Sequence, residues 1–134
     1  MQREEKNTRR IGAYYEEQAA QYLQSKGYTI IKRNYKTPYG EIDLIAKKPD
    51  LLVFCEVKFR SSDRYGTGLE AVTVKKQQRI IKSARYFCNW YCGSKEFAYR
   101  FDVIAIEPQE KICHIENAFE LQNKELIHGE WSYG

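Results

Sequence analysis

The 134-residue sequence contains no apolar run near the roughly 18 residues that a membrane-spanning helix requires. Its amino terminus, MQREEKNTRRIG, has basic residues but no apolar core behind them, so no secretory signal is expected. Internal repeats and low-complexity segments are also absent. These absences favour one domain, residues 1–134, that stays in the cytoplasm and has no membrane partner.

Cysteine pairs of the C-x-x-C type are absent too, although the sequence has four cysteines. Reduced and mostly buried thiols are therefore the simpler interpretation. A zinc site is the alternative, but the spacing of its ligands would be unlike that of the usual zinc frameworks. Such a site would use Cys88, Cys92, Cys113 and His114.

What the sequence does contain is an ordinary globular composition with a slight excess of positive charge. It is 43% hydrophobic and 30% charged, with a net charge of +4 and a pI near 8.8. A mildly basic chain permits a polyanionic partner without requiring one. The positions of the charges are therefore more informative than their sum.

Hydrophobic periodicity predicts two helices and five strands. Residues 1–8 are polar and expected to fray, and residues 117–134 have no firm pattern. Strands joined by a short turn must be antiparallel, whereas a long helix between strands permits a parallel crossover. We expect an α/β fold with a central mixed sheet flanked by helices. The expected elements are a helix at 8–26, strands at 28–35, 41–47 and 51–60, a helix at 73–92, and strands at 96–106 and 111–116.

Each expected helix has one apolar face that should be buried. In the first helix the apolar stripe begins with Ile11 and Tyr15, and in the second it includes Val74 and Tyr91. Glu16 stacks with apolar residues of the first helix, so it should point toward the buried side.

The segment 40–60, GEIDLIAKKPDLLVFCEVKFR, places charged groups in two very apolar strands. Glu56 and Lys58 are two residues apart, so they project from the same face, and the turn at 47–50 folds Asp43 back beside them. Ionised groups in such strands cost several kcal/mol unless they are paired. Two neighbouring carboxylates suit Mg²⁺, and a nearby lysine can orient water or stabilise phosphate charge. A structural salt bridge between Glu56 and Lys58 is the alternative.

The second helix carries basic residues outside its buried stripe. Lys75, Arg79 and Lys82 share one face, and Lys76 and Arg85 flank it. This face could contact phosphates without regard to sequence, and a plain solvated helix face is the alternative. The glycine-containing segment that follows the strand at 51–60 is expected to be a loop. Arg60, Arg64 and Tyr65 there would extend the same nucleic-acid-binding surface, and the aromatic ring could stack on a base.

Several motifs together resemble the YraN-like family of predicted endonucleases. They are GEIDLIA at 40–46, LVFCEVKFR at 52–60, the residues from Gly66 to Arg79, RFDVIAI at 100–106 and HIENAF at 114–119. The resemblance covers about residues 12–119. It implies the restriction-endonuclease-like fold and the PD-(D/E)xK nuclease superfamily, with a layout similar to archaeal Holliday-junction resolvases.

The resemblance also implies roles for individual residues. It places metal-binding acids at Asp43 and Glu56, a further metal ligand at the carbonyl of Val57, and the active-site lysine at Lys58. It places the glutamate of a helix-one G-E-x-x-A motif at Glu16. Tyr15 stands where that motif has glycine, and Ile42 stands where the strand motif has proline.

Together these features lead to the hypothesis of a DNA endonuclease that uses Mg²⁺ or Mn²⁺ and acts on branched or damaged DNA, with RNA also compatible. The alternatives are a non-catalytic nucleic-acid-binding module with the same fold, and a protein in which the acids form only a salt-bridge network. A homodimer would supply two sites for cuts on opposed strands, but the sequence names no interface.

Overall fold

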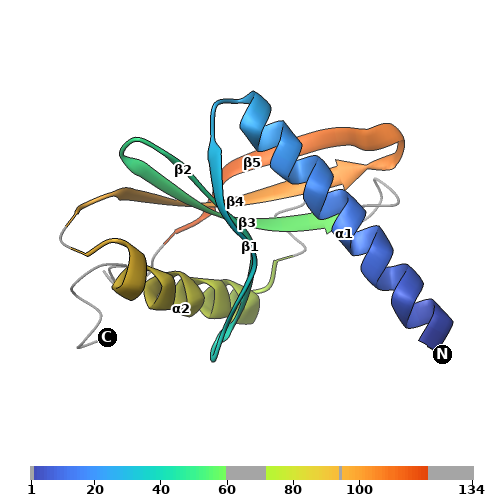
Figure 1. Ribbon diagram of the computed structural model, residues 1–134, viewed down its shortest axis with the longest axis horizontal. Coiled ribbons are helices and arrows are strands. Elements are labelled where there is room, and N and C mark those ends of the chain that lie inside the picture. Colours follow the sequence, from blue (N-terminus) through green and yellow to red (C-terminus); the bar gives the residue numbers. More distant parts are fainter. Residues whose placement is uncertain (1, 60–71, 94, 121–134) are drawn as a thin grey trace.

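The computed structural model describes residues 2–59, 72–93 and 95–120, and side chains from residue 10 onward. A five-stranded sheet separates two helices (Figure 1). The elements in chain order are α1 (Gln2–Ser25), β1 (Thr29–Thr37), β2 (Gly40–Lys48), β3 (Leu51–Phe59), α2 (Val74–Tyr91), β4 (Ala98–Glu107), a 3₁₀ turn (Pro108–Glu110) and β5 (Lys111–Phe119). The expected order of helices and strands is confirmed.

The sheet is mixed, with strand order β1-β2-β3-β4-β5. The pairs β1–β2, β2–β3 and β4–β5 are antiparallel, because short turns join them. The pair β3–β4 is parallel, and α2 lies in the connection between these two strands. An α/β fold with a mixed sheet flanked by helices is thus what the structure shows.

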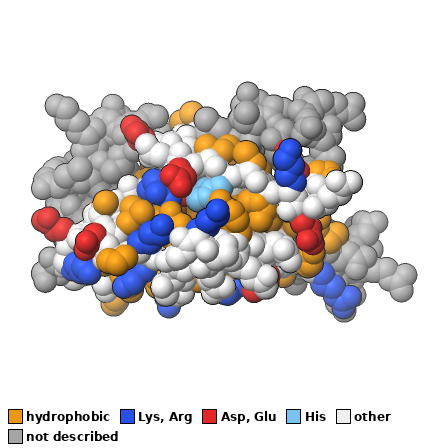
Figure 2. All heavy atoms as spheres, turned by 90° about the horizontal axis from the view of Figure 1, so that it is seen from above, with side chains coloured by type: hydrophobic (Ala, Val, Ile, Leu, Met, Phe, Trp, Pro, Cys, Tyr) orange, Lys and Arg blue, Asp and Glu red, His pale blue; other side chains and the backbone are white. Residues whose placement is uncertain are grey.

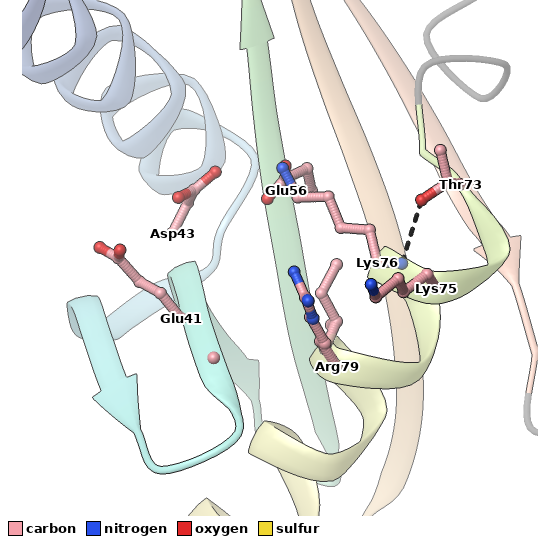
Figure 3. Close-up of a pocket in the computed structure, with 9 residues that line it drawn as sticks. Glu41, Asp43, Glu56, Thr73, Lys75, Lys76 and Arg79 are labelled. Carbon is pink, nitrogen blue, oxygen red and sulfur yellow. Dashed lines mark hydrogen bonds and ion pairs between the residues drawn. The ribbon is translucent and has the colours of Figure 1, made fainter.

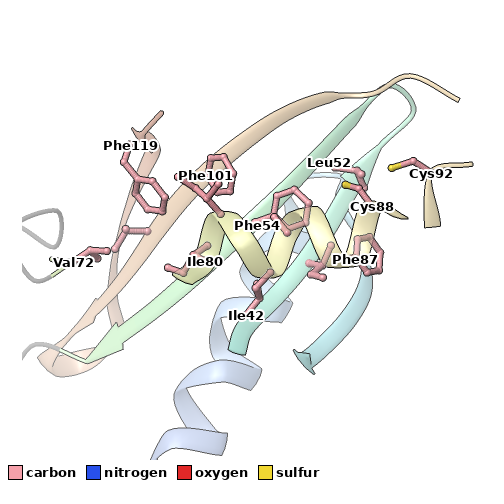
Figure 4. Close-up of a cluster of buried hydrophobic side chains, with 14 residues drawn as sticks. Ile42, Leu52, Phe54, Val72, Ile80, Phe87, Cys88, Cys92, Phe101 and Phe119 are labelled. Atoms are coloured by element: carbon pink, nitrogen blue, oxygen red, sulfur yellow. The ribbon is translucent and has the colours of Figure 1, made fainter. Parts of the chain in front are cut away.

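Each face of the sheet packs against one helix. On one face, residues of α2 such as Ile80 and Phe87 pack on Phe54 and Phe101 of the central strands (Figure 4). On the other face, Leu23 of α1 packs against Ile104 and its neighbours. β3 therefore lies between two apolar layers, which explains its continuous apolar run.

The turn between β1 and β2 is held close to α2 by a glycine and a hydroxyl pair. Gly40 has a φ of +153°, and a Cβ built there would lie 3.4 Å from the Cβ of Arg79. The hydroxyl oxygens of Thr37 and Ser83 lie 2.8 Å apart, which joins β1 to α2. These contacts fix the start of β2, and with it Glu41 and Asp43, opposite the first half of α2.

A cluster of polar side chains centred on Asp102 is buried beneath α1, and it lies far along the chain from the 40–60 segment. The fully buried carboxylate of Asp102 accepts two hydrogen bonds from Arg100, both 2.8 Å, and one from the backbone N–H of Asn117 over 3.0 Å. Nε2 of His114 lies 2.6 Å from Asp102, and Nδ1 of His114 lies 3.1 Å from the hydroxyl of Tyr22. This chain of contacts joins α1 to β4 and β5. Figure 2 shows a histidine side chain on this face with basic, acidic and hydrophobic side chains around it, and His114 is the one histidine among the described residues.

The pKa values support a structural role for this group. Burial opposes ionisation of Asp102, but the hydrogen bonds from His114, Arg100 and Asn117 outweigh it and hold its pKa below the ordinary value. Burial raises the pKa of Tyr22, so its hydroxyl stays protonated. A protonated phenol is a poor nucleophile. The cluster around Asp102 therefore has a structural role: it joins α1 to β4 and β5.

The zinc interpretation of the cysteines is wrong. Cys88 and Cys92 are buried in the layer against α2, whereas His114 contacts Tyr22 and Asp102 on the α1 side. Cys113 is exposed, and all four cysteines are free thiols. Burial in an apolar layer also raises the pKa of Cys88 well above that of a free thiol, which disfavours the thiolate that zinc requires.

Three details of the expected helices also change. α1 begins at Gln2, so residues 2–8 continue the helix where fraying was expected; their Gln, Arg, Glu and Lys are good helix formers. Ile11 is 53% exposed, because α1 extends past the sheet before its apolar stripe meets a partner (Figure 1). Val74 and Tyr91 are exposed for a related reason: they lie at the two ends of α2, beyond the layer that covers its centre.

Candidate active site

β2 and β3 part at one end of the sheet, and the candidate site lies where they part. Their ladder runs from Lys48 paired with Leu51 to Leu44 paired with Cys55. Beyond Leu44, β2 stays paired with β1 as far as Gly40, while β3 continues beside β4. Where the ladder ends, the side chain of Asp43 on β2 takes the place of the backbone as hydrogen-bond partner of β3.

A pocket of about 370 Å³ opens at this point. Figure 3 shows acids of β2 on one side, Glu56 of β3 between, and basic residues of α2 on the other side. The lining residues are Gly40, Glu41, Asp43, Glu56, Thr73, Lys75, Lys76, Arg79 and Ile80. Acids of two consecutive strands and bases of α2, which is more distant in sequence, thus face one small volume.

Asp43 and Glu56 are neighbours in this pocket, as the sequence predicts. Burial and the charge of Glu56 raise the pKa of Asp43 to about 8, and a hydrogen bond from the backbone N–H of Val57 only partly offsets this rise. That N–H lies 2.8 Å from Oδ2 of Asp43. Without a cation between them, the charge of Glu56 therefore disfavours the ionised form of Asp43.

Glu56 is paired with two lysines. Its side chain is only 5% exposed, and Lys58 Nζ lies 3.5 Å from Oε2. Lys76, in the first turn of α2, makes a second ion pair with the same oxygen. The salt-bridge interpretation of Glu56 and Lys58 thus describes a real contact, but the contact is part of a larger cluster of charges.

The environment of Lys58 favours loss of its proton. Burial lowers the pKa of Lys58, the neighbouring ammonium group of Lys76 lowers it further, and Glu56 opposes the change. For Lys76 the balance differs: the ion pair with Glu56 outweighs burial, and its pKa is raised. The two lysines on one carboxylate are therefore not equivalent.

Glu16 of α1 lies near the site but does not line the pocket. Burial raises its pKa, and the charges of Glu41 and Glu56 raise it further, whereas a hydrogen bond with Asn34 lowers it. The prediction that Glu16 points inward is consistent with this environment. Its position permits it to influence the acids of the pocket from the α1 side.

The basic face of α2 divides into residues inside and outside the pocket. Lys75 and Arg79 line it, Lys76 is paired with Glu56, and Lys82 is exposed one turn beyond. The side chain of Thr73 caps α2 by accepting a hydrogen bond from the N–H of Lys76 over 3.1 Å. The first turn of α2, the positive end of the helix dipole, thus borders the pocket, where it favours anions. The predicted contacts at Arg60, Arg64 and Tyr65 lie outside the described residues.

Sequence reasoning missed Glu41 and undervalued Lys76. Glu41 precedes Asp43 by two positions on one strand, the spacing of side chains on a common face, and that signal was available. The pairing of Lys76 with Glu56 had no local signal, because it depends on how α2 docks against β3.

The residues of the pocket fit a divalent cation of the magnesium type. Among the described residues, no three His, Cys, Asp or Glu side chains gather closely enough to hold a metal alone. Mg²⁺ does not require such a cage, since it commonly binds one or two carboxylates and keeps several waters. Asp43 and Glu56 supply two carboxylates. Val57 donates its N–H toward Asp43, and because a strand residue directs its N–H and C=O to the same side, its carbonyl faces that side too.

The mixed sheet, the helix on each face and the pocket of acids and bases define an α/β protein with a charged pocket beside its central strands. Residues 15–106 match the family described as "Uncharacterised protein family UPF0102". The chain belongs to this family, which is the YraN-like group that its motifs indicate, and the membership supports a nuclease-like function at the level of the family. The matched region includes every described site residue from Glu16 to Lys82.

Curated relatives agree over most of their length. A UPF0102 protein of Alkaliphilus oremlandii is 48% identical over 115 residues, which is 83% of this chain and 98% of the relative. One of Thermodesulfovibrio yellowstonii is 47% identical over 109 residues, covering 81% and 95%. One of Vibrio parahaemolyticus is 42% identical over 111 residues, covering 82% and 92%.

Among solved structures, Pyrococcus furiosus SfsA in complex with Ca²⁺ superposes loosely, with a TM-score of 0.35 and 17% identity. The superposition covers 85% of this chain and 65% of that one.

No described helix is both long and apolar enough to cross a membrane.

Proposed function

We propose that this protein is a DNA endonuclease that hydrolyses phosphodiester bonds with the help of Mg²⁺ or Mn²⁺. The observation that carries the proposal is the convergence of Asp43 and Glu56, from two strands that part, in a pocket that also holds basic residues of α2. Acids suit a metal and bases suit phosphates, and their meeting in one pocket favours phosphoryl chemistry over either function alone.

The residues divide the work as follows. Asp43, Glu56 and the carbonyl of Val57 would hold the cation, and Glu16 would act as an outer ligand or orient one from the α1 side. When bound, the cation supplies positive charge for the phosphate oxygens and lowers the pKa of a water. Lys58, whose own pKa is lowered by burial, orients the attacking water and exchanges protons with it. The water oxygen attacks phosphorus in line and gives a proton to the neutral amine of Lys58. The bond from phosphorus to the 3′ oxygen breaks, and this oxygen takes a proton from solvent water, so the products are a 5′-phosphate and a 3′-hydroxyl.

The basic face of α2 holds the nucleic acid. Lys75, Arg79 and Lys82 lie at and beyond the pocket, and Arg60, Arg64 and Tyr65 extend this track in our proposal. Phosphate contacts of this kind are independent of sequence, so structure would select the substrate. Branched or damaged DNA is the class we favour, RNA is compatible with the same contacts, and the cytoplasm is the expected location. A homodimer would allow paired cuts on opposed strands.

The test incubates purified protein with labelled single-stranded, duplex, flapped and four-way-junction DNA in Mn²⁺. Cleavage of at least one substrate that disappears with EDTA and in Lys58→Ala would support the proposal. If no substrate is cleaved although DNA binds, the protein is a non-catalytic nucleic-acid-binding module. If neither binding nor cleavage occurs, the acids and lysines form only a salt-bridge network.

A further inference from the structure

One carboxylate in the pocket forms ion pairs with two lysine ammonium groups. Glu56 is 5% exposed and pairs with both Lys58 and Lys76 through the same oxygen, Oε2. A buried carboxylate needs a positive partner, but one partner is sufficient for its charge. Two lysines on one oxygen also repel each other, and this repulsion is part of what lowers the pKa of Lys58. One lysine is therefore available to leave when another cation arrives.

Lys76 is the lysine that can leave. Its side chain is 41% exposed, compared with 27% for Lys58, and it lines the pocket whereas Lys58 does not. Its backbone is fixed by the Thr73 cap at the start of α2, so its side chain can turn without a change in the helix. Figure 3 shows Lys76 reaching from α2 across to Glu56, with Lys75 and Arg79 beside it.

A divalent cation on Glu56 would displace Lys76 by charge repulsion. Two positive charges within about 4 Å of each other repel strongly even at the effective dielectric of a protein surface. The released ammonium group would then lie at the mouth of the pocket, beside Lys75 and Arg79. A phosphate of bound nucleic acid is the anion that this position could accept.

We propose that Lys76 neutralises Glu56 in the metal-free protein and transfers to a nucleic-acid phosphate when a divalent cation binds Glu56. The inference rests on the proposed function and adds a coupling between its two ligands. The cation frees a phosphate-binding lysine, and a bound phosphate holds that lysine away from the cation's ligand. By thermodynamic linkage each ligand then raises the affinity of the other.

The first test is calorimetric titration of Mn²⁺ into the protein without DNA. Lys76→Met removes the competing charge, so we expect Mn²⁺ to bind on the order of tenfold more tightly than to the wild type. Lys82→Met removes an equal charge from the same helix, away from Glu56, and should leave the affinity within about twofold. Lys76→Gln should behave like Lys76→Met, and circular dichroism checks that each variant folds.

The second test measures coupling with fluorescently labelled junction DNA, with and without Ca²⁺, which takes the same oxygen ligands. In the wild type we expect Ca²⁺ to raise DNA affinity by more than about fivefold, and in Lys76→Met by less than about twofold. Equal coupling in the two proteins, or Mn²⁺ binding to Lys76→Met that is unchanged or weaker, would overturn the inference alone. A wild type that binds neither Mn²⁺ nor DNA would overturn the proposed function together with it.

Discussion

The backbone N–H of Val57 donates a hydrogen bond to Oδ2 of Asp43 over 2.8 Å, at the point where the β2–β3 ladder has ended. A side chain thus takes the place of the backbone carbonyl that would continue the ladder. This contact holds Asp43 against β3, one residue from Glu56, and leaves the space between the strands open as a pocket. The geometry of the proposed site follows from this one exchange, in which the Asp43 carboxylate replaces a backbone carbonyl as the acceptor of the Val57 N–H.

The first prediction concerns the raised pKa of Asp43. Because its pKa in the folded protein is about 8, well above that of the unfolded chain, the folded state keeps a proton between pH 4 and 8 that the unfolded state has lost. The stability of the metal-free protein should therefore fall as pH rises through this window. The side chain of the Asp43→Asn variant cannot ionise, so its unfolding free energy should decrease less as the pH rises. Urea unfolding at pH 5, 7 and 9 measures this difference. Identical pH dependence in the two proteins would contradict the assignment.

The second prediction separates charge from proton transfer at Lys58. Lys58→Ala should lower the rate of single-turnover DNA cleavage by about 10²–10⁴-fold while DNA affinity stays within about threefold. Arginine keeps the charge but does not give up its proton, so Lys58→Arg should stay inactive if Lys58 exchanges protons with water. Restoration of activity by arginine would show that only the charge is needed.

The third prediction concerns salt. If the basic face of α2 contacts DNA phosphates, replacing its three outward residues with alanine should reduce the slope of log affinity against log salt by about 0.9 for each lost contact. Fluorescence anisotropy from 50 to 300 mM NaCl measures the slope. The variant changes Lys75, Arg79 and Lys82, and the control changes the exposed residues Lys26, Lys95 and Lys111, none of which lines the pocket. Equal slopes for the two variants would argue against this face as the DNA-binding surface.

The fourth prediction concerns the buried group under α1. Asp102→Ala leaves the guanidinium of Arg100, 19% exposed, without its main partner and should cost about 3–5 kcal/mol of unfolding free energy. The contribution of Asp102 should be lost at acid pH, because its pKa is lowered in the folded state and its ionised form stabilises the fold. Glu116→Ala is the matched control: Glu116 is 59% exposed and pairs with the same arginine at 3.7 Å, so its loss should cost less than about 1 kcal/mol. Equal effects of the two changes would show that Asp102 is not the main partner.

Much of the fold could be predicted from local patterns. Strand alternation and the turn at 47–50 predicted that β2 and β3 are antiparallel, which the register confirms. They also predicted that Asp43 returns beside Glu56, and both acids line one pocket. The exposure of Ile11 could not be predicted, because an apolar stripe does not indicate where the sheet beneath it ends. The pairing of Lys76 with Glu56 was missed for a similar reason. It depends on the docking of α2, which Gly40 and Ser83 set through contacts that are distant in sequence.

The most direct test of the central claim is calorimetric titration of Mn²⁺ into the wild type, Asp43→Ala and Glu56→Ala, with circular dichroism to confirm folding. If these two carboxylates hold the cation, the wild type should bind Mn²⁺ and each variant should bind it at least about tenfold more weakly. Affinity that is unchanged in both variants would contradict a metal site at Asp43 and Glu56.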